Sequence, residues 1–212
     1  MSDLGTQGHQ AQQESSSRQR ILESAGDEFA KYGLAGARVD RIAEEAGVNK
    51  AMLYYHFHSK EKLYEDVVEE FFRQIAGRIR IHMSREGSLE EMLQGIADAH
   101  AQMVADTPKI IPILLRELAE PHGDLLDSVA NTIWSEGMIE SSRERIDEAM
   151  QSGECRHLDV RQMIISFVAM SLGYHLLAPL ADRVWNVTDR KAFIEERRKG
   201  IVDLFLYGVK VR

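Results

Sequence analysis

The chain contains very little cysteine and proline: its 212 residues include one cysteine, Cys155, and four prolines. A single thiol cannot form an internal disulfide, so the fold does not depend on an oxidising compartment. Scarce proline leaves long stretches free to form helices. Runs of β-branched residues that alternate with polar ones are also missing, whereas Leu, Ala, Glu, Arg and Met are plentiful. We therefore expect an all-α protein.

The sequence also shows no signal peptide and no membrane-spanning segment that we recognise. The start, MSDLGTQGHQAQQESSS, lacks the basic residues and apolar centre of a signal peptide. We find no apolar stretch that approaches the about 18 residues needed to span a membrane. The expectation is a cytoplasmic protein that does not contact a membrane.

An excess of basic residues is also missing, because the net charge is −8. The distribution is uneven, however. Residues 15–62 hold eight Lys or Arg and seven Asp or Glu, which gives +1 and leaves −9 for the remainder. An acidic body with a less acidic head is compatible with a DNA-binding module joined to a different module, although +1 alone is no basic patch.

Hydrophobic spacing and capping residues predict about nine helices. Their expected ranges are 16–33, 39–46, 49–57, 60–84, 88–105, 107–120, 124–151, 160–181 and 188–208. Residues 1–15 are polar and Gln-rich, and we expect a disordered tail there. Residues 16–62 are then a three-helix head, helix 60–84 is the link, and residues 85–212 are a C-terminal helical body.

The short helices at 39–46 and 49–57 fit a helix-turn-helix, in which the first braces the second across the DNA backbone. Gly47 permits the sharp turn between them. With Leu53 and Phe57 assigned to the core, the second helix leaves an unusual outward set: Lys50, Ala51, Met52, Tyr54, Tyr55 and His56. The hydroxyl and imidazole groups can donate to phosphate, Lys50 and Lys60 add charge, and Ala51 and Met52 can touch thymine methyls.

The stretch ILESAGDEFAKYGLAGARVDRIAEEAGVNKAMLYYHFHSKEKLYEDVV resembles the N-terminal domain of the tetracycline-repressor (TetR) family. The pieces IAEEAGV and LYYHF-x-SKE are specific together, and the close resemblance covers residues 18–68. Over residues 80–212 it extends only to helix number and length. The resemblance implies DNA contacts at Lys50, Ala51, Tyr54, Tyr55, His56 and Lys60. It also implies a homodimer on a palindromic double-stranded operator, and a ligand cavity whose occupation releases the DNA.

Arg38 departs from the family pattern, which usually has Ser or Thr just before the brace helix. That hydroxyl caps the helix and meets a phosphate, so we expect a lost cap worth about 1 kcal/mol. The guanidinium of Arg38 is a candidate replacement for the phosphate contact. A purely structural helix pair, or a head that has lost DNA affinity, remains as an alternative reading of 39–57.

Dimerisation is expected through the last two helices, because both are apolar on most faces. The candidate interface residues are Leu172, Leu176, Ile201, Leu204 and Phe205. The alternative is that these helices are buried in the core of a monomer.

A cavity for a hydrophobic effector is expected among the helices from 88 to 181. Its candidate residues are His100, Met103, Arg116, Trp134, Met138, Phe167, Met170 and Tyr174. Glu117 and His175 join His100 and Arg116 as side chains that could orient a polar group of the ligand. For these four a surface ion pair or a satisfied core position is the simpler reading, and for the other candidates the ordinary core is an equally simple one.

Metal and catalytic patterns give no positive signal. Cys155-x-His157 is an isolated pair, and nothing resembles a nucleophile elbow, a P-loop or a dinucleotide fingerprint. We expect no metal, no cofactor and no enzymatic activity. Three functions stay in competition: a ligand-responsive repressor, an architectural or partner-recruiting DNA-binding protein without small-molecule control, and a small-molecule enzyme.

Overall fold

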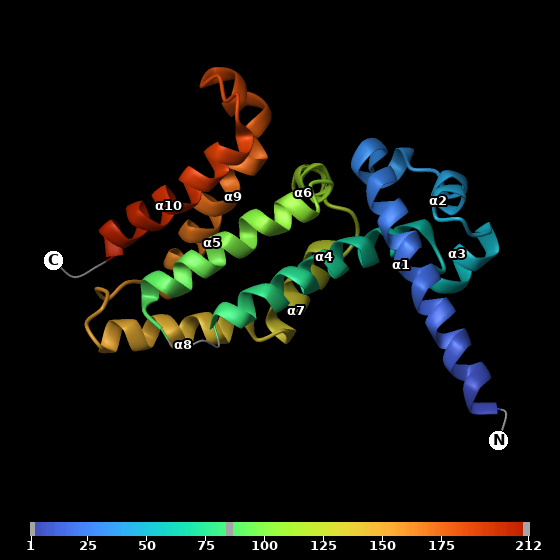
Figure 1. Ribbon diagram of the computed structural model, residues 1–212, viewed down its shortest axis with the longest axis horizontal. Coiled ribbons are helices and arrows are strands. Elements are labelled where there is room, and N and C mark those ends of the chain that lie inside the picture. The colour runs from blue at the N-terminus through green and yellow to red at the C-terminus, as the bar shows by residue number, and fades with distance from the viewer. Residues whose placement is uncertain (1–2, 84–86, 210–212) are drawn as a thin grey trace. The chain divides into compact units, whose positions relative to one another are not determined.

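The computed structural model describes the backbone of residues 3–83 and 87–209, with side chains from residue 15 onward, and these residues form ten α-helices (Figure 1). The helices are α1 (Asp3–Gly36), α2 (Val39–Glu45), α3 (Lys50–Phe57), α4 (Lys60–Met83), α5 (Leu89–Asp106), α6 (Ile110–Ala119), α7 (Leu125–Ser135), α8 (Met138–Gln151), α9 (Val160–Val184) and α10 (Arg190–Val209). The all-α prediction is confirmed, with ten helices in the described part of the chain against about nine expected.

Two compact units divide the chain. The head unit holds the residues up to Phe71 together with Lys109–Leu126, and the body unit holds Phe72–Pro108 and the residues from Asp127 onward. This grouping differs from the expected division at residues 62 and 85, because α6 packs against α1 and so belongs to the head unit. Residue 84, the expected end of the linking helix, lies outside the described residues.

The head unit is built around the apolar stripe of α1. Ile21, Ala25 and Phe29 are fully buried, and the Phe29 ring meets Tyr64 of α4 edge to face at 5.0 Å between centroids. Helical geometry is interrupted at Gly33, whose φ of 68° is costly for residues with a Cβ. The predicted stop at Gly33 is therefore confirmed, with a short continuation to Gly36.

The start of α1 corrects the prediction. We expected a disordered tail over residues 1–15 and a helix start near Ser16, but the helix begins at Asp3. No proline interrupts residues 3–16, and Leu, Gln, Ala and Glu tolerate helical geometry well, so the helix extends without an apolar stripe. Residues 1 and 2 lie outside the described residues.

A buried carboxylate joins α6 to α4 inside the head unit. Glu117 is only 1% exposed, and its Oε2 accepts a hydrogen bond of 3.2 Å from the Tyr64 hydroxyl. The same carboxylate accepts the His122 backbone N–H at 2.7 Å and lies 3.1 Å from His122 Nδ1. Burial, together with the charge of Glu117, raises the pKa of Tyr64, so this hydroxyl keeps its proton and donates.

In the body unit, α5 packs against α8, α9 and α10. The predicted capping box is confirmed at the start of α5: Ser88 Oγ accepts the Glu91 N–H at 3.2 Å, and the Glu91 carboxylate accepts the Ser88 N–H at 2.8 Å. Between α9 and α10, the rings of Phe167 and Phe205 meet edge to face at 5.1 Å.

Two predicted helix boundaries in the body are wrong. The single helix expected over 124–151 is two helices, α7 and α8, because Gly137 adopts the left-handed conformation (φ 67°, ψ 14°) between them. Thr107 does not cap the following helix as expected. It ends α5, its N–H bonding to the Met103 carbonyl, and α6 begins only at Ile110.

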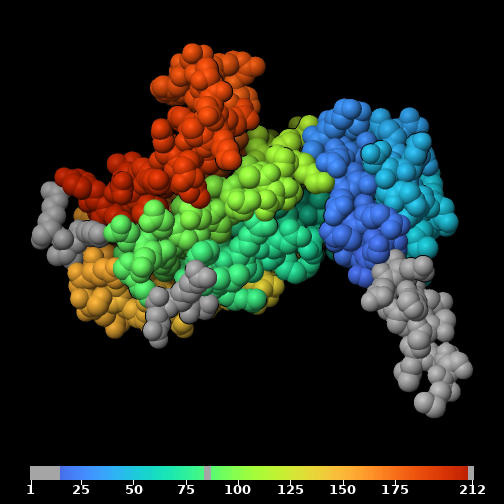
Figure 2. Space-filling model, viewed as in Figure 1, coloured from blue at the N-terminus to red at the C-terminus, as the bar shows by residue number. Residues whose placement is uncertain are grey.

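The expectation that no apolar stretch approaches membrane-spanning length is also wrong. Helix α9 is long and apolar enough to cross a membrane by length and composition, and only 28% of its most apolar window is buried within the chain. Figure 2 shows the end of α9 and the start of α10, in orange and orange-red, standing out from the rest of the body unit. This arm, residues 176–190, exposes Leu177, Leu180, Val184 and Trp185.

Replacing Glu117 with Ala should lower the free energy of unfolding by about 2–3 kcal/mol, because Tyr64 and His122 lose their buried acceptor. Glu117→Gln should cost less, since the amide oxygen still accepts one of these bonds. Urea unfolding followed by circular dichroism measures both. Glu120→Ala, at an exposed position three residues on, is the control, and an equal loss for Glu117→Ala and Glu120→Ala would contradict the prediction.

Candidate functional site

Helix α3 is held on the head unit by its two apolar residues. Leu53 and Phe57 are fully buried, and the Arg18 guanidinium lies 5.2 Å above the Phe57 ring. Asn49 caps the helix, with Oδ1 accepting the Met52 N–H at 2.8 Å. The inward residues therefore fix which side of α3 is left outside.

The outward side of α3 carries two tyrosines and a methionine. Tyr55 is 66% exposed and Tyr54 is 40% exposed, while Met52 and Ala51 are also at the surface. The Tyr55 ring is positioned by an edge-to-face contact of 5.3 Å with the His56 ring. Large aromatic groups with free polar tips on a short, rigidly held helix are well suited to contacts with a groove and its phosphates.

Two of the predicted contact residues already have partners within the head unit. His56 is half-buried, and its Nε2 lies 3.1 Å from the Ser17 hydroxyl of α1. Lys60 is half-buried as well, and its ammonium donates to the carbonyls of Ala35 and Ala37 at 3.5 and 3.4 Å. Both residues thus support the site from its edge, with less of each side chain presented outward than predicted.

Lys50, at the first turn of α3, forms an exposed ion pair with Asp40 of α2 at 2.8 Å. The hydrogen bond and the charge of Asp40 raise the pKa of Lys50, and the same contacts lower the pKa of Asp40. An exposed pair of this kind contributes little stability, so a phosphate can displace Asp40 at small cost.

The start of α2 at Arg38 is held by a residue of α1. Arg38 makes no side-chain cap, as predicted, but its backbone N–H donates to Glu28 Oε1 at 2.8 Å. Glu28 also pairs with Arg41 at 2.7 Å, and the Arg41 guanidinium lies 4.1 Å above the Tyr32 ring. The exposed Arg38 side chain is therefore free of a capping role.

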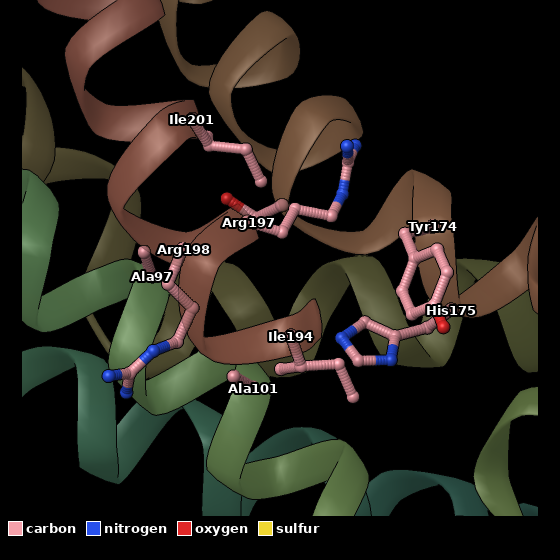
Figure 3. A pocket seen from close by; sticks show the side chains of 9 residues that line it. Ala97, Ala101, Tyr174, His175, Ile194, Arg197, Arg198 and Ile201 are labelled. Atoms are coloured by element: carbon pink, nitrogen blue, oxygen red, sulfur yellow. The ribbon is translucent and has the colours of Figure 1, made fainter. Parts of the chain in front are cut away.

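A small cavity of the body unit lies between α5, α9 and α10 (Figure 3). It comprises about 270 Å³, part of which is open to solvent. Its lining residues are Ala97, Ala101, Ser171, Tyr174, His175, Ile194, Arg197, Arg198 and Ile201. Of the predicted ligand residues, Tyr174 and His175 line this cavity.

Burial shifts the pKa values of the groups around this cavity. His100 lies on α5 next to the cavity wall, and burial lowers its pKa to about 4, with the charge of His175 as a second cause. Burial also lowers the pKa of His175, followed by the charges of Arg197 and Arg190. Both imidazoles are therefore neutral at pH 7. The Tyr174 hydroxyl donates to Asp182 at 2.7 Å, and burial together with this bond raises its pKa.

The other predicted ligand residues lie elsewhere. Arg116 and Glu117 belong to the head unit, where Arg116 donates to two backbone carbonyls of α1. Trp134 is 57% exposed on α7, and Met138 begins α8 half-buried. The remaining four, His100, Met103, Phe167 and Met170, belong to the body unit but do not line the cavity.

The predicted dimer residues separate into two groups. Ile201 and Phe205 are buried within the chain, and Leu172 and Leu176 are half-buried. Leu204 alone among the five is strongly exposed, at 67%. Much of the exposed apolar surface of α9 and α10 is carried by residues outside these five candidates: Ile165, Leu177, Leu180, Val184 and Tyr207.

Sequence reasoning missed Arg197 and Arg198 as cavity residues because α10 was assigned to the interface alone. It missed Ser171 of α9 because the search for lining residues selected large apolar and aromatic side chains. Within the described part of the chain, no group of three His, Cys, Asp or Glu side chains is placed to hold a metal ion.

Comparison with known proteins identifies the same segment. Residues 21–67 match the family described as "Bacterial regulatory proteins, tetR family". Over 208 residues, covering 98% of this chain and 97% of the relative, the chain is 24% identical to the HTH-type transcriptional regulator RutR of Escherichia coli K12. It is 34% identical over 114 residues, 52% of each protein, to the HTH-type transcriptional repressor NicS of Pseudomonas putida.

Solved structures extend the similarity of fold to the body. The regulator FadR of Bacillus subtilis, in complex with stearoyl-CoA, matches with a TM-score of 0.73 at 20% identity, covering 90% of this chain and 98% of FadR. A fatty acid metabolism regulator of Clostridium perfringens matches with a TM-score of 0.73 at 21% identity, covering 91% of this chain and all of that one. At these identities the likeness establishes the fold.

Glu28→Ala should lower the free energy of unfolding by about 1–2 kcal/mol, because the N–H of Arg38, the N-cap residue of α2, loses its acceptor and Arg41 loses its partner. Urea unfolding followed by circular dichroism measures the loss. Glu44→Ala, exposed on α2, is the control, and an equal loss for Glu28→Ala and Glu44→Ala would contradict the anchoring of α2 by Glu28.

Proposed function

We propose that this chain is a transcriptional regulator of the tetR family that represses transcription by binding a palindromic operator as a homodimer. It leaves the DNA when a small molecule occupies its body unit. The outward side of α3 carries this proposal. Tyr54 and Tyr55 are exposed on a helix whose opposite side is fully buried. A short helix held in this way fits the major groove of DNA, and the proposed location of the protein is the cytoplasm.

In the proposed complex, α3 lies in the major groove and its neighbours meet the backbone. Tyr54 and Tyr55 supply hydroxyl donors, and Ala51 and Met52 supply apolar contacts to thymine methyls. Lys50 exchanges Asp40 for a phosphate. The exposed guanidinium of Arg38, which has no capping role, is available to a second phosphate.

Tyr55→Ala should weaken operator binding by about tenfold or more while leaving the Tm unchanged, because the side chain is exposed. Gel-shift titration on the DNA upstream of the protein's own gene measures the loss. For the wild-type protein, log K should fall with log salt at a slope near −0.9 per phosphate neutralised.

Trp134→Ala is the matched control for Tyr55→Ala, since it removes an equally exposed aromatic group from α7. It should leave operator affinity unchanged. Full affinity of the Tyr55→Ala protein would contradict the role of α3. Absence of a shifted band for a folded wild-type dimer at low salt would contradict the proposed function as a whole.

The homodimer is proposed from the exposed apolar surface of α9 and α10. Leu177, Leu180 and Trp185 stand out on the arm, and Leu204 and Tyr207 are exposed further along α10. So large an apolar surface needs cover. A second copy supplies the same surface, and two copies of α9 and α10 give a four-helix interface that brings two α3 helices to the two halves of a palindrome.

Leu204→Glu should shift the protein from dimer to monomer, because each interface would then bury two carboxylates without partners. Light scattering after size-exclusion chromatography should give twice the mass of one chain for the wild type and the mass of one chain for the variant. Ala130→Glu, exposed on α7, should remain dimeric. An unchanged mass for Leu204→Glu would contradict this interface.

The release step is proposed from relatives and from the cavity together. FadR of Bacillus subtilis holds stearoyl-CoA in its crystal structure, and the present chain shares its fold. The cavity between α5, α9 and α10 is the corresponding candidate here. Its small volume also favours a second candidate function, an architectural or partner-recruiting DNA-binding protein without small-molecule control.

A further inference from the structure

The cavity of the body unit holds an excess of buried hydrogen-bonding groups that have no protein partner. Arg197 Nε, Arg198 Nε and Ser171 Oγ are all buried and unpaired, and Ser171 is 7% exposed as a residue. His100 Nδ1, close by on α5, is a fourth such atom, and His100 is 4% exposed. Each unpaired polar atom of this kind is costly in a folded protein unless a ligand or an ordered solvent molecule meets it.

Charge separates the two arginines. Arg198 is neutralised, because its terminal nitrogens lie 2.8 Å from Asp98 and 2.7 Å from Glu195. Arg197 makes no ion pair with any described residue. Its contacts are a 3.2 Å hydrogen bond to the Met170 carbonyl and the Tyr174 ring, 5.9 Å from its central carbon. A half-buried guanidinium without a carboxylate partner is energetically costly, because its positive charge is not compensated.

Figure 3 shows how these groups surround the space. The side chains of Arg197 and Arg198 extend from α10 in opposite directions, toward α9 and toward α5, in agreement with their partners on those helices. His175 and Ile194 lie beside one another in the same view. One part of the lining is therefore cationic and rich in donors, and the rest is apolar.

We propose that this cavity binds a compact organic anion, whose carboxylate or phosphate group accepts hydrogen bonds from Arg197 Nε and the Ser171 hydroxyl. Guanidinium nitrogens can only donate, so the missing partner of Arg197 is an acceptor, and a charged one compensates the guanidinium as well. The regulatory meaning of this site rests on the proposed function, whereas the binding itself does not.

The apolar lining defines the rest of the ligand. Ala97, Ala101, Ile194 and Ile201 surround the space beside the polar groups, so the anion carries a short aliphatic or aromatic body. The space between these side chains, about 270 Å³ with the open solvent included, excludes a large ligand from full enclosure. This narrows the hydrophobic effector expected from the sequence to an amphipathic one with an anionic head.

The first test needs no ligand. If Arg197 serves ligand binding and not stability, the Arg197→Met protein should have a Tm at least as high as that of the wild type. The reason is that an uncompensated charge is replaced by an apolar side chain of similar length. Arg198→Met, which removes the paired guanidinium beside it, is the comparison variant. A Tm for Arg197→Met clearly below that of the wild type would make Arg197 a structural residue and overturn the proposal.

The second test measures binding to the full-length protein by thermal shift and calorimetry. The probes are octanoate, benzoate, octyl phosphate and phenyl phosphate, each at up to about 10 mM, with octanol and benzyl alcohol as neutral counterparts. At least one anion should raise the Tm of the wild type, and its neutral counterpart should not. Octanoate and octyl phosphate share an octyl chain, and benzoate and phenyl phosphate share an aromatic ring. Comparing the Tm shifts within each pair shows whether the site prefers a carboxylate or a phosphate.

Affinity for that anion should fall by about tenfold or more in Arg197→Met and partly recover in Arg197→Lys, which keeps the charge without the Nε donor. Arg143→Met, exposed on α8, should bind like the wild type. Neutral probes that stabilise the wild type as well as the anions, no Tm shift with any anion, or undiminished anion affinity in Arg197→Met would each overturn the proposal.

A gel shift on the operator, carried out without any anion, tests the proposed function separately. Anion binding without operator binding would support the anion site and contradict the proposed function. Operator binding without anion binding would support the proposed function and contradict the anion site.

Discussion

The buried carboxylate of Glu117 is the contact on which the head unit depends most. It receives the Tyr64 hydroxyl from α4 and the His122 N–H from the turn after α6, and it is almost wholly removed from solvent. A buried charge is tolerated only when its acceptor sites are filled, so these partners cannot move independently. Arg116, one residue earlier, binds the carbonyls of Phe29 and Ala30. Two adjacent residues of α6 with opposite charge thus tie this helix to α1, through Arg116, and to α4, through Glu117.

How much of this follows from the sequence depends on the range of the interaction. The bounds of α2, α3 and α4 were predicted to within one residue, because their caps and apolar spacings are local. The contacts of His56 with Ser17 and of Lys60 with Ala35 join residues 39 and 25 positions apart, and no local pattern encodes them. The break between α7 and α8 at Gly137 was not predicted, because the residues on both sides favour a helix and only the positive φ of Gly137 in the structure shows the break.

The same distinction applies to the candidate ligand site. Met, Trp and Phe were selected for their residue type, but type does not determine which side of a helix faces a space. Phe167 is turned to Phe205 and Trp134 to solvent, whereas small residues such as Ala97 and Ser171 leave the space open. The importance of Arg197 arises from a partner that is missing in three dimensions, which a sequence cannot display.

Helix α10 links the two proposed binding events of the body unit. Ile194, Arg197 and Ile201 form part of the cavity wall, while Leu204 and Tyr207 of the same helix are exposed on the surface proposed for dimerisation. A helix is stiff over this length, so in the proposed regulator an anion that draws Arg197 toward the cavity would also change how Leu204 is presented. Thermodynamic linkage would then require the reverse effect to be equal: a second copy that fixes α10 would alter the affinity for the anion by the same factor. If both proposals hold, the position of α10 is the variable through which ligand binding and dimer geometry are coupled.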